Sequence, residues 1–533
     1  MTRSVWWFAL ALGGCVASTD PSVDPTAASP GSTRAGSAHT PQTWRAITAP
    51  MPSGFAPAVP QLMQDGTLIV QNYGTDEWWK LTPDAFGQYD NGTWTQVASS
   101  NGYSPLFDAQ AVLPDGRMIV EGGEYLNLQE AWTTEGAIYD PIADKWTSVA
   151  PPADWKDYNS ATGTDVGTIG DAAGIVLPDG TFMLSNCCST QFAKLDPATL
   201  AWTPAGQNKE DWNDEESWST LFDGRIVTAD ANVGSNTTDY QHSEIYTPST
   251  DMWTPLPDVP VELDDVVPTN PDSSSHEVGP EMTRPDGTIV AIGATPHNAM
   301  FDPASMTWTA LPDTPGSGAT EDGPGATLPN GNVIFATAPY NGTFAAGTSW
   351  YEWDGTSFTK VGGTTDDAQL ATYEHFLVML PTGELLHTQD SYISGTIQLY
   401  TPAPGVAANA IPEILGEPEL VGSGAEPPTA PIPTIYKGRS YTMPIARMNG
   451  IDLGATYGDD VQTSTDFPIV RVTASASGHV WYCRTHDPTD RSTSPDEQGA
   501  ATFDVPDATE GGAAEIAVIA NGIASAPLIV NIK

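Results

Sequence analysis

The 533-residue sequence predicts an all-β protein, in which a seven-bladed β-propeller is followed by an immunoglobulin-like β-sandwich. A turn element that recurs seven times and an aromatic element that recurs every 50 to 56 residues predict the propeller. Alternating apolar residues that return after a Pro-rich stretch predict the sandwich. The high numbers of Gly (50) and Pro (47) fit a chain of many short strands and turns.

The charge balance restricts the partners of the protein. Asp and Glu total 66 and Lys and Arg only 19, which gives a formal net charge of -47. So few cations cannot form the basic stripe that a nucleic-acid backbone or an anionic membrane surface requires. The acidity instead favours neutral or cationic ligands.

The N-terminus has the features of a bacterial lipoprotein signal peptide, residues 1–15. An apolar run at 4–12, too short to span a bilayer, leads to Leu12-Gly13-Gly14-Cys15, which resembles a lipobox. We therefore expect export, with lipidation of Cys15 as the only membrane attachment, at the outer membrane, at the cell surface or in the periplasm. The alternative is a plain signal peptide. Residues 16–40, rich in Ser, Thr, Pro, Ala and Gly, are expected to form a disordered tether.

A hairpin turn marks each unit of the repeat between residues 41 and 402. Asp-Gly or Asn-Gly between apolar runs favours a type I′ turn, in which both central residues have positive φ. The turn glycines are Gly66, Gly116, Gly180, Gly224, Gly287, Gly331 and Gly383. Seven units of this length, each with four short strands, are typical of a β-propeller.

An aromatic residue typical of an outer strand recurs seven times, and Thr follows it at six of these positions. These residues are Trp44, Trp94, Trp146, Trp202, Trp253, Trp308 and Phe358. The last unit lacks this element, whereas Trp44 precedes the first hairpin. We therefore predict that the strand around Trp44 completes the seventh blade, which removes an open sheet edge.

The repeat ends near residue 402, and a different pattern follows. Residues 403–435, rich in Pro, Ala, Gly and Glu, are expected to be a linker with one early strand. Alternation then returns between 436 and 533, for example at 467–472 and 514–520. Strands of this kind separated by turn clusters predict an immunoglobulin-like domain.

These motifs resemble a known kind of repeat and a known protein family. Leu113-Pro114-Asp115-Gly116, Gly122-Gly123 and the Tyr139–Thr147 segment resemble kelch repeats. A kelch propeller with a carboxy-terminal sandwich resembles the galactose oxidase and glyoxal oxidase family, whose sandwich motif is matched by Ile469-Val470-Arg471 and Arg484. The resemblance covers about two thirds of the chain as repeats and implies fold more than function.

The resemblance also implies a copper site made of two Tyr and two His, with a Cys cross-linked to one Tyr. Counted from the hairpins, the matching positions hold Phe107 or Asp108 for the Cys, Asp171 for the cross-linked Tyr, Glu374 for one His and Ser477 for the other. Only Tyr373 keeps a family ligand, so we expect neither copper nor copper-radical oxidase activity. His375 and His479 lie one and two positions away, so a register slip would bring a nitrogen to these positions, but a one-residue slip in a strand points the side chain to the other face.

Carboxylates take the place of those ligands, 8 to 10 residues before the hairpin glycines. They are Asp108, Asp171, Glu215, Glu277, Asp322 and Glu374. Repeat symmetry would bring them to one mouth of the central channel, where like charges raise one another's pKa or require a cation. Trp212, Trp218 and His276 lie nearby in sequence.

Several interpretations of this mouth stay open. The carboxylates could bind Ca²⁺ or another divalent cation, although no cofactor is assured. A pair could act as acid and base on a glycosidic bond. They could also be solvated charges of a very acidic protein. We expect foremost the binding of a neutral or cationic ligand, a glycan, through Asp108, Glu215, Glu277, Asp322, Trp212 and Trp218.

An enzyme at the same mouth is the alternative function. It would be a carbohydrate hydrolase or lyase, or a copper oxidase with altered ligands. Its catalytic residues would be Tyr373, Glu374, His375 and Asp171. A protein–protein scaffold is the third possibility.

The remaining cysteines allow two arrangements. Cys187 and Cys188 are adjacent, and Cys483 is distant in sequence. A vicinal disulfide is one arrangement, since export permits disulfides. We favour the other, in which the thiols are buried or one of them pairs with Cys483.

Overall fold

The computed structural model describes residues 39–533, except 154, 156–168, 188, 232–240, 265–276, 342–343, 390–395, 423–431 and 461–462. Cys15, the signal peptide, nearly all of the tether, Cys188 and His276 therefore lie outside the described residues. Within them the regular elements are strands, apart from the short 3₁₀ turns η2 (Thr372–Glu374) and η3 (Ala408–Ala410). The all-β prediction is confirmed. In this part of the chain no helix is long and apolar enough to cross a membrane.

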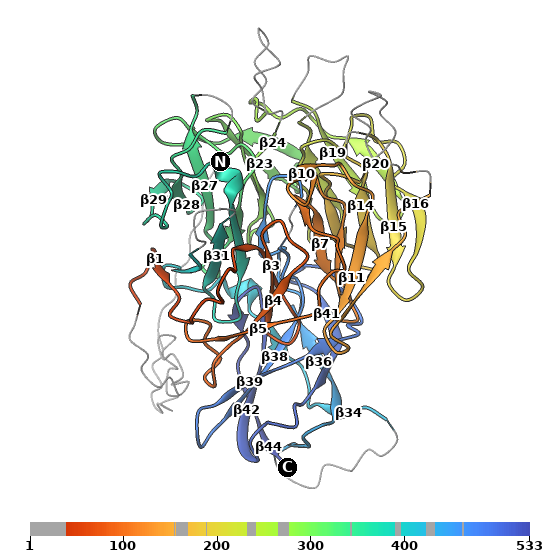
Figure 1. Cartoon of the computed structure of the whole chain (residues 1–533), viewed down its shortest axis with the longest axis vertical. Coiled ribbons are helices and arrows are strands. Elements are labelled where there is room, and N and C mark those ends of the chain that lie inside the picture. Colours follow the sequence, from red (N-terminus) through yellow and green to blue (C-terminus); the bar gives the residue numbers. More distant parts are fainter. Residues whose placement is uncertain are drawn as a thin grey trace, which may run out of the picture. The chain divides into compact units, whose positions relative to one another are not determined.

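Seven antiparallel sheets, each built on four strands, form the blades of a propeller (Figure 1). Blades 1 to 3 contain β2 (Pro57–Leu62), β3 (Leu68–Asn72), β4 (Trp78–Thr82) and β5 (Thr93–Gln96); β7 (Ala109–Val112), β8 (Met118–Glu121), β11 (Gly136–Asp140) and β12 (Lys145–Val149); β13 (Gly174–Val176), β14 (Phe182–Ser185), β15 (Phe192–Asp196) and β16 (Ala201–Ala205). A small sheet of β6 (Pro105–Leu106), β9 (Tyr125–Leu126) and β10 (Gln129–Glu130) accompanies blade 2.

The other blades repeat the same order. Blades 4 to 6 contain β17 (Ser219–Thr220), β18 (Ile226–Ala229), β19 (Ser243–Thr247) and β20 (Met252–Pro255); β21 (Glu281–Thr283), β22 (Ile289–Ile292), β23 (Asn298–Asp302) and β24 (Thr307–Ala310); β26 (Gly325–Thr327), β27 (Val333–Pro339), β28 (Ser349–Trp353) and β29 (Phe358–Lys360). β25 (Gly318–Ala319) also pairs with β27. Blade 7 contains β30 (His375–Met379), β31 (Leu385–Gln389), β32 (Gln398–Thr401) and β1 (Thr43–Ala46).

Each hairpin turn of the repeat ends in a glycine with positive φ. All seven turn glycines have φ between 75° and 87°. The preceding Asp115 does not have positive φ, and the Gly116 N–H donates to the Leu113 carbonyl at 2.9 Å. The turn is therefore of type I with a left-handed glycine at its end, so the predicted type I′ geometry is wrong.

The strand around Trp44 completes blade 7. β1 pairs antiparallel with β32, with Thr43 opposite Thr401 and Ala46 opposite Gln398. The Trp44 ring packs at 5.0 Å from that of Trp350, which anchors the strand. The propeller core lies between neighbouring blades: the inner strands β7 and β13 contact each other, β17, β21, β26 and β30 contact one another in that order, and β30 contacts β2.

The last part of the chain forms a sandwich of two sheets, drawn in blue in Figure 1. One sheet contains β33 (Glu413–Ile414), β34 (Glu419–Leu420), β36 (Ser440–Ala446), β40 (Thr485–His486) and β41 (Gln498–Asp504). The other contains β35 (Thr434–Ile435), β38 (Ile469–Ala474), β39 (Val480–Cys483), β42 (Gly512–Ala520), β43 (Ile523–Ala524) and β44 (Leu528–Ile532). Cys483 is buried in this core and Cys187 is buried in the propeller, and these two are not paired with each other.

One long connection of the sandwich runs into the propeller. We call residues 447–466, between β36 and β38, the central loop. Its strand β37 (Ala455–Thr456) pairs with β26 of blade 6. Gln61 of blade 1 donates to the Ser464 carbonyl at 3.0 Å, and Ser217 of blade 4 donates to the Tyr457 carbonyl at 3.2 Å. Because separate blades hold it, the central loop lies inside the ring, and its described residues from 448 onward are all buried.

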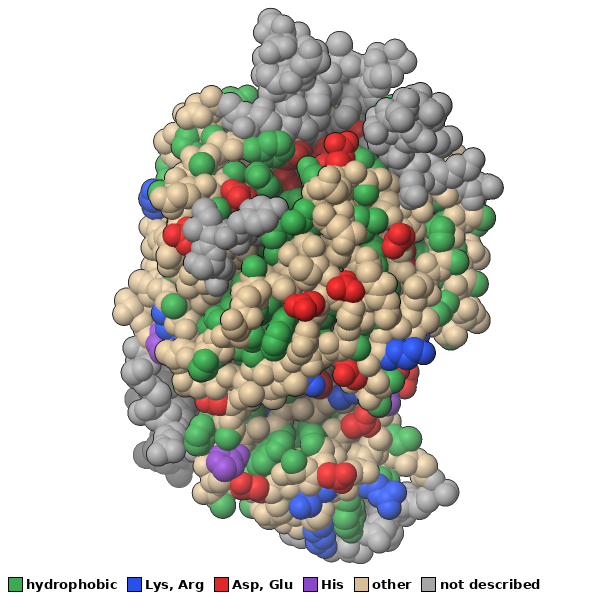
Figure 2. Space-filling model, viewed as in Figure 1, with side chains coloured by type: hydrophobic (Ala, Val, Ile, Leu, Met, Phe, Trp, Pro, Cys, Tyr) green, Lys and Arg blue, Asp and Glu red, His purple; other side chains and the backbone are tan. Residues whose placement is uncertain are grey.

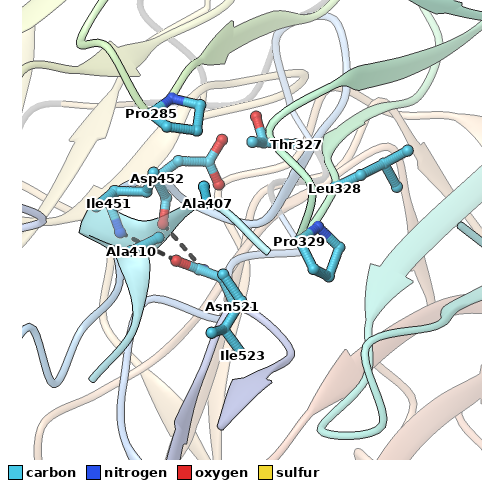
Figure 3. A pocket seen from close by; sticks show the side chains of 10 residues that line it. All are labelled: Pro285, Thr327, Leu328, Pro329, Ala407, Ala410, Ile451, Asp452, Asn521 and Ile523. Carbon is cyan, nitrogen blue, oxygen red and sulfur yellow. Dashed lines mark hydrogen bonds between the residues drawn. The ribbon is translucent and has the colours of Figure 1, made fainter. Parts of the chain in front are cut away.

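The base of the central loop is fixed where it leaves the sandwich. Asn521 accepts a hydrogen bond from the Ile451 N–H at 3.1 Å and donates to the Asp452 carbonyl at 3.1 Å (Figure 3). These residues line a cavity of about 10 Å³, which is room for one water molecule. Burial raises the pKa of Asp452 to about 7.

Candidate metal centre

The tip of the central loop brings two carboxylates into the propeller. Asp459 is 3% exposed and Asp460 is 0% exposed. The Tyr457 hydroxyl donates to the Tyr373 carbonyl, which ties the tip to blade 7. The intervening Gly458 allows a close approach, because a Cβ atom there would overlap the Asp322 carboxylate.

Carboxylates from the blades meet this tip. The ligand oxygens of Asp171, Glu215 and Asp459 all lie within 4.8 Å of one another, and so do those of Asp322, Asp459 and Asp460. Glu277, Asp108 and Glu124 interact electrostatically with members of these groups. We define the carboxylate cluster as Asp108, Glu124, Asp171, Glu215, Glu277, Asp322, Asp459 and Asp460. On the face shown in Figure 2, acidic side chains gather in a recess near the top of the view.

Burial and mutual repulsion perturb these groups strongly. Burial raises the pKa of Asp108 and of Glu124 to about 7, and that of Asp459 to about 6. For Glu215, Glu277, Asp322 and Asp460 the pKa lies well above the usual range, first because of burial and then because of neighbouring carboxylates. Among the described residues no Lys, Arg or His contributes to any of these pKa shifts. The cluster therefore either takes up protons, which neutralise its carboxylates, or binds a cation, which balances their negative charge.

Asp460 is the member of the cluster that most strongly indicates a bound cation. Among the described residues neither of its carboxylate oxygens has a hydrogen-bond partner, although the side chain is fully buried. Burying an ionised carboxylate without a partner costs several kcal/mol at least, in order of magnitude. Its oxygens lie in a group of the spacing that suits one cation. The donor atoms are all oxygens, which hard cations such as Ca²⁺ and Mn²⁺ prefer.

The backbone beneath the cluster adopts an uncommon conformation in three blades. Phe107, Glu215 and Asp322 have φ of 53°, 60° and 45°, and each lies nine residues before a hairpin glycine. For a residue other than Gly this left-handed region costs roughly 1–2 kcal/mol. Two of these three residues, Glu215 and Asp322, are members of the carboxylate cluster.

A second buried acidic group in the propeller is paired with a lysine. Lys209, fully buried, lies 2.5 Å from Asp230, 2.7 Å from Glu244 and 3.2 Å from Glu216. Burial alone would lower the pKa of Lys209, but these carboxylates raise it above its usual value. Here the lysine takes the place of a metal ion, whereas the carboxylate cluster has no such side chain among the described residues.

Five of the six carboxylates predicted from the repeat join the cluster, and Glu374 does not. The Glu374 carboxylate accepts the Ala371 N–H at 2.8 Å and caps the turn η2. Tyr373 is partly exposed beside the cluster, with ring centroids 6.0 Å from Phe107 and 5.2 Å from Phe344. It therefore belongs to an aromatic rim of the site.

His375, for which a catalytic role was predicted, lies in the core of blade 7. Its ring is fully buried within blade 7, and Nδ1 lies 2.8 Å from Nε2 of His387. Burial lowers the pKa of His375 to about 3, so it is neutral at ordinary pH. Strand alternation places it in the blade core rather than at the mouth.

Trp218, for which a ligand-binding role was predicted, is likewise buried in the core. Trp218 is 1% exposed and packs between Phe192 and Trp253, and its Nε1 donates to Asn213 at 3.1 Å. It is a core residue between blades 3 and 4. Trp212 is partly exposed, and its role stays a prediction.

The sandwich position matched to the family's second His lies outside the carboxylate cluster. Ser477 is exposed in the turn between β38 and β39, where it donates to Glu510 at 2.7 Å. His479 lies beside the same Glu510 at 2.7 Å. The sandwich contributes instead through the central loop, which belongs to neither strand.

Copper does not fit the donors that the structure describes. Every group of described residues that could hold a metal contains carboxylates alone, without a His or Cys. The nitrogen donors of a copper-radical site are therefore not assembled by these residues. His276 lies outside them, so the expected absence of copper stays a prediction.

Comparisons with known proteins add the following. No family model matches the chain, and no curated protein matches it. Among solved structures, a chain described as "Novel fungal alcohol oxidase with catalytic diversity among the AA5 family, in complex with copper" is 12% identical, with a TM-score of 0.48. The match covers 92% of this chain and 98% of that one. No residue role in the present chain follows from this likeness.

Three members of the cluster were not predicted. Asp459 and Asp460 lie in a connection between strands, where no repeat marks their position, and Glu124 follows Gly122-Gly123 in a loop. The signal that could have found the first two is a long segment rich in small and polar residues, between two predicted strands, that carries adjacent acids. Such a segment inside a sandwich suggests an excursion into a neighbouring domain.

Proposed function

We propose that this protein binds a hard divalent cation, Ca²⁺ or Mn²⁺, at the carboxylate cluster and uses it to hold a neutral glycan at the propeller mouth. The observation that carries the cation is Asp460, whose buried oxygens lack hydrogen-bond partners among the described residues and share one site with Asp322 and Asp459. Carboxylate oxygens suit Ca²⁺, which takes six to eight oxygen ligands. The other buried acidic group, around Lys209, is compensated by the charge of that lysine.

The rim of the site supports a sugar ligand. A bound Ca²⁺ with open positions coordinates vicinal hydroxyl groups, and aromatic rings pack against the apolar faces of sugars. Tyr373 and Phe107 are partly exposed, and Phe344 is 39% exposed. The Phe344 N–H donates to Glu321, whose charge acts on Glu277 of the cluster. The rings and the cluster are therefore neighbours, which a combined metal and stacking site requires.

Calorimetry tests the cation and the ligand separately. The purified full-length chain, stripped with a chelator, is titrated with Ca²⁺ and then with a panel of neutral glycans in the presence and absence of Ca²⁺. We expect Asp460→Asn to weaken Ca²⁺ binding at least about tenfold, since it removes a charged ligand. The matched control is Glu497→Gln, a buried carboxylate of the sandwich whose pKa burial raises to about 7. Equal Ca²⁺ affinity in Asp460→Asn and the wild type would contradict the proposal.

The enzyme alternatives keep only part of their predicted residues. Tyr373 and Asp171 lie at the mouth, whereas Glu374 caps a turn and His375 is buried in blade 7. Hydrolase or lyase activity therefore stays a prediction from the sequence.

Export and lipidation also stay proposals, carried by residues 1–15 alone. Mass spectrometry of the N-terminal peptide from membranes of the producing cell tests them. We expect a diacylglyceryl group on Cys15, which Cys15→Ser abolishes. An unmodified mature N-terminus would contradict this.

A further inference from the structure

We propose that the carboxylate cluster holds two divalent cations, bridged by the Asp459 carboxylate. The inference deepens the proposed function and rests on it. Two groups of ligand oxygens, each within 4.8 Å, share Asp459 and nothing else. Asp171 and Glu215 complete one group, and Asp322 and Asp460 complete the other.

The geometry of each group suits a separate ion. Oxygens about 2.4 Å from a Ca²⁺ ion lie at most about 4.8 Å apart, and the ligand oxygens of each group lie within that distance of one another. One group is built by blades 3 and 4 together with the central loop, and the other by blade 6 together with the same loop. A carboxylate that bridges two metal ions holds them about 3.5–4 Å apart, so one Asp459 side chain can serve both positions.

Charge supports two ions rather than one. The cluster contains eight carboxylates, and no basic side chain among the described residues contributes to the pKa shifts that its members show. With all eight ionised, one divalent cation leaves six negative charges, and two leave four. Asp459 is the residue that belongs to both groups of ligand oxygens, as expected of a carboxylate between the two positions.

The second position has its own evidence in Asp460. Both Asp460 oxygens are buried and lack hydrogen-bond partners among the described residues, so the carboxylate is available as a bidentate ligand. It is not a member of the group formed with Asp171 and Glu215. A single ion in that first group would leave Asp460 and Asp322 uncompensated.

Mn²⁺ provides the experiment, because its paramagnetic resonance spectrum reports on a neighbouring Mn²⁺. The purified full-length chain is stripped with a chelator, loaded with Mn²⁺ by equilibrium dialysis, and analysed for bound metal and for its spectrum. We expect two Mn²⁺ per chain and a spectrum broadened by coupling between them. Glu215→Gln and Asp460→Asn should each retain one Mn²⁺ with an uncoupled six-line spectrum. Glu497→Gln, outside the cluster, should retain two coupled ions.

The outcomes separate this inference from the proposed function. One Mn²⁺ per wild-type chain, weakened by both variants, would overturn the second ion and leave the cation site standing. Two ions without coupling would overturn the Asp459 bridge. No bound Mn²⁺ or Ca²⁺ would overturn both proposals. The wild-type stoichiometry decides the matter even where a variant fails to fold.

Discussion

At the scale of single residues, the site depends on how closely backbone and side chain approach. Gly458 lies between Tyr457 and Asp459 at the loop tip, and a Cβ atom there would meet the Asp322 carboxylate. Its φ is not in the left-handed region, so an alanine suffers from the overlap alone. The glycine is therefore needed for the position of one ligand rather than for the turn.

Gly458→Ala tests this approach. We expect it to displace the Asp322 carboxylate and to weaken Ca²⁺ binding by about tenfold or more, since one charged ligand is misplaced. Calorimetric titration measures the change. Gly511→Ala is the control, because a Cβ atom there makes an ordinary contact and its φ is not positive. Unchanged affinity in Gly458→Ala would show that Asp322 is not a ligand.

Lys209 gives a prediction about stability. Lys209→Met leaves Asp230, Glu216 and Glu244 buried without their cation, and breaking a buried ion pair in this way costs about 3–5 kcal/mol. We expect a loss of that order in the free energy of unfolding, measured with urea. Lys360→Met, which removes an exposed lysine, should change it by less than about 0.5 kcal/mol. Equal stabilities of the two variants would contradict the role given to Lys209.

At the scale of elements, the ring is closed by pairing between the two ends of the repeat. Trp44 of β1 packs on Trp350 and on Tyr400, with centroids 5.0 and 4.8 Å away, and Arg45 pairs with Glu384 at 2.6 Å. These contacts hold a four-residue strand that has no other neighbour in its sheet. Blade 7 therefore depends on the side-chain contacts of β1 to keep its outer strand in place.

Trp44→Ala is expected to destabilise the protein by about 3 kcal/mol, the usual order for removing a large aromatic side chain from a packed site. Thermal unfolding measures the effect, and the loss of protection in hydrogen exchange should begin in β1 and β32. Thr43→Ala, at the end of the same strand, should change stability by less than about 0.5 kcal/mol. An unchanged midpoint in Trp44→Ala would mean that β1 does not hold the ring.

The blades were predictable from the sequence because each is a local unit. Hairpin glycines and outer-strand tryptophans recur at fixed spacing, and strand alternation follows from nearest neighbours. The placement of Asp171 and Asp322 near the channel follows from the same repeat. The central loop was not predictable, since its contacts with Gln61 and Ser217 join residues hundreds of positions apart. Burial of Trp218 and His375 depends in the same way on neighbouring strands, which single-sequence patterns do not show.

At the scale of the whole molecule, the central loop couples the sandwich to the propeller. Asp452 lies at its base, fully buried beside Asn521 and Thr327 (Figure 3). Burial raises the pKa of Asp452 from its usual 3.8 to about 7. The folded protein therefore keeps a proton on Asp452 that the unfolded chain releases above about pH 4.

Asp452→Asn tests the sign of this effect. A carboxyl group with a raised pKa favours the folded state at low pH, and this contribution is lost as the pH rises from about 4 to about 7. Raising a pKa from 3.8 to about 7 corresponds to at most roughly 4 kcal/mol. We therefore expect Asp452→Asn to gain stability relative to the wild type between pH 4 and pH 8. A difference in unfolding free energy that is constant across this range would contradict the account.

Metal analysis decides whether the carboxylate cluster is a site for hard cations. The full-length chain is purified without chelator, dialysed, and analysed by inductively coupled plasma mass spectrometry beside Asp460→Asn. The account predicts calcium or manganese bound to the wild-type chain, in a reduced amount in the variant. Copper in its place, or no divalent metal in the wild type even after addition of Ca²⁺ and Mn²⁺, would contradict it.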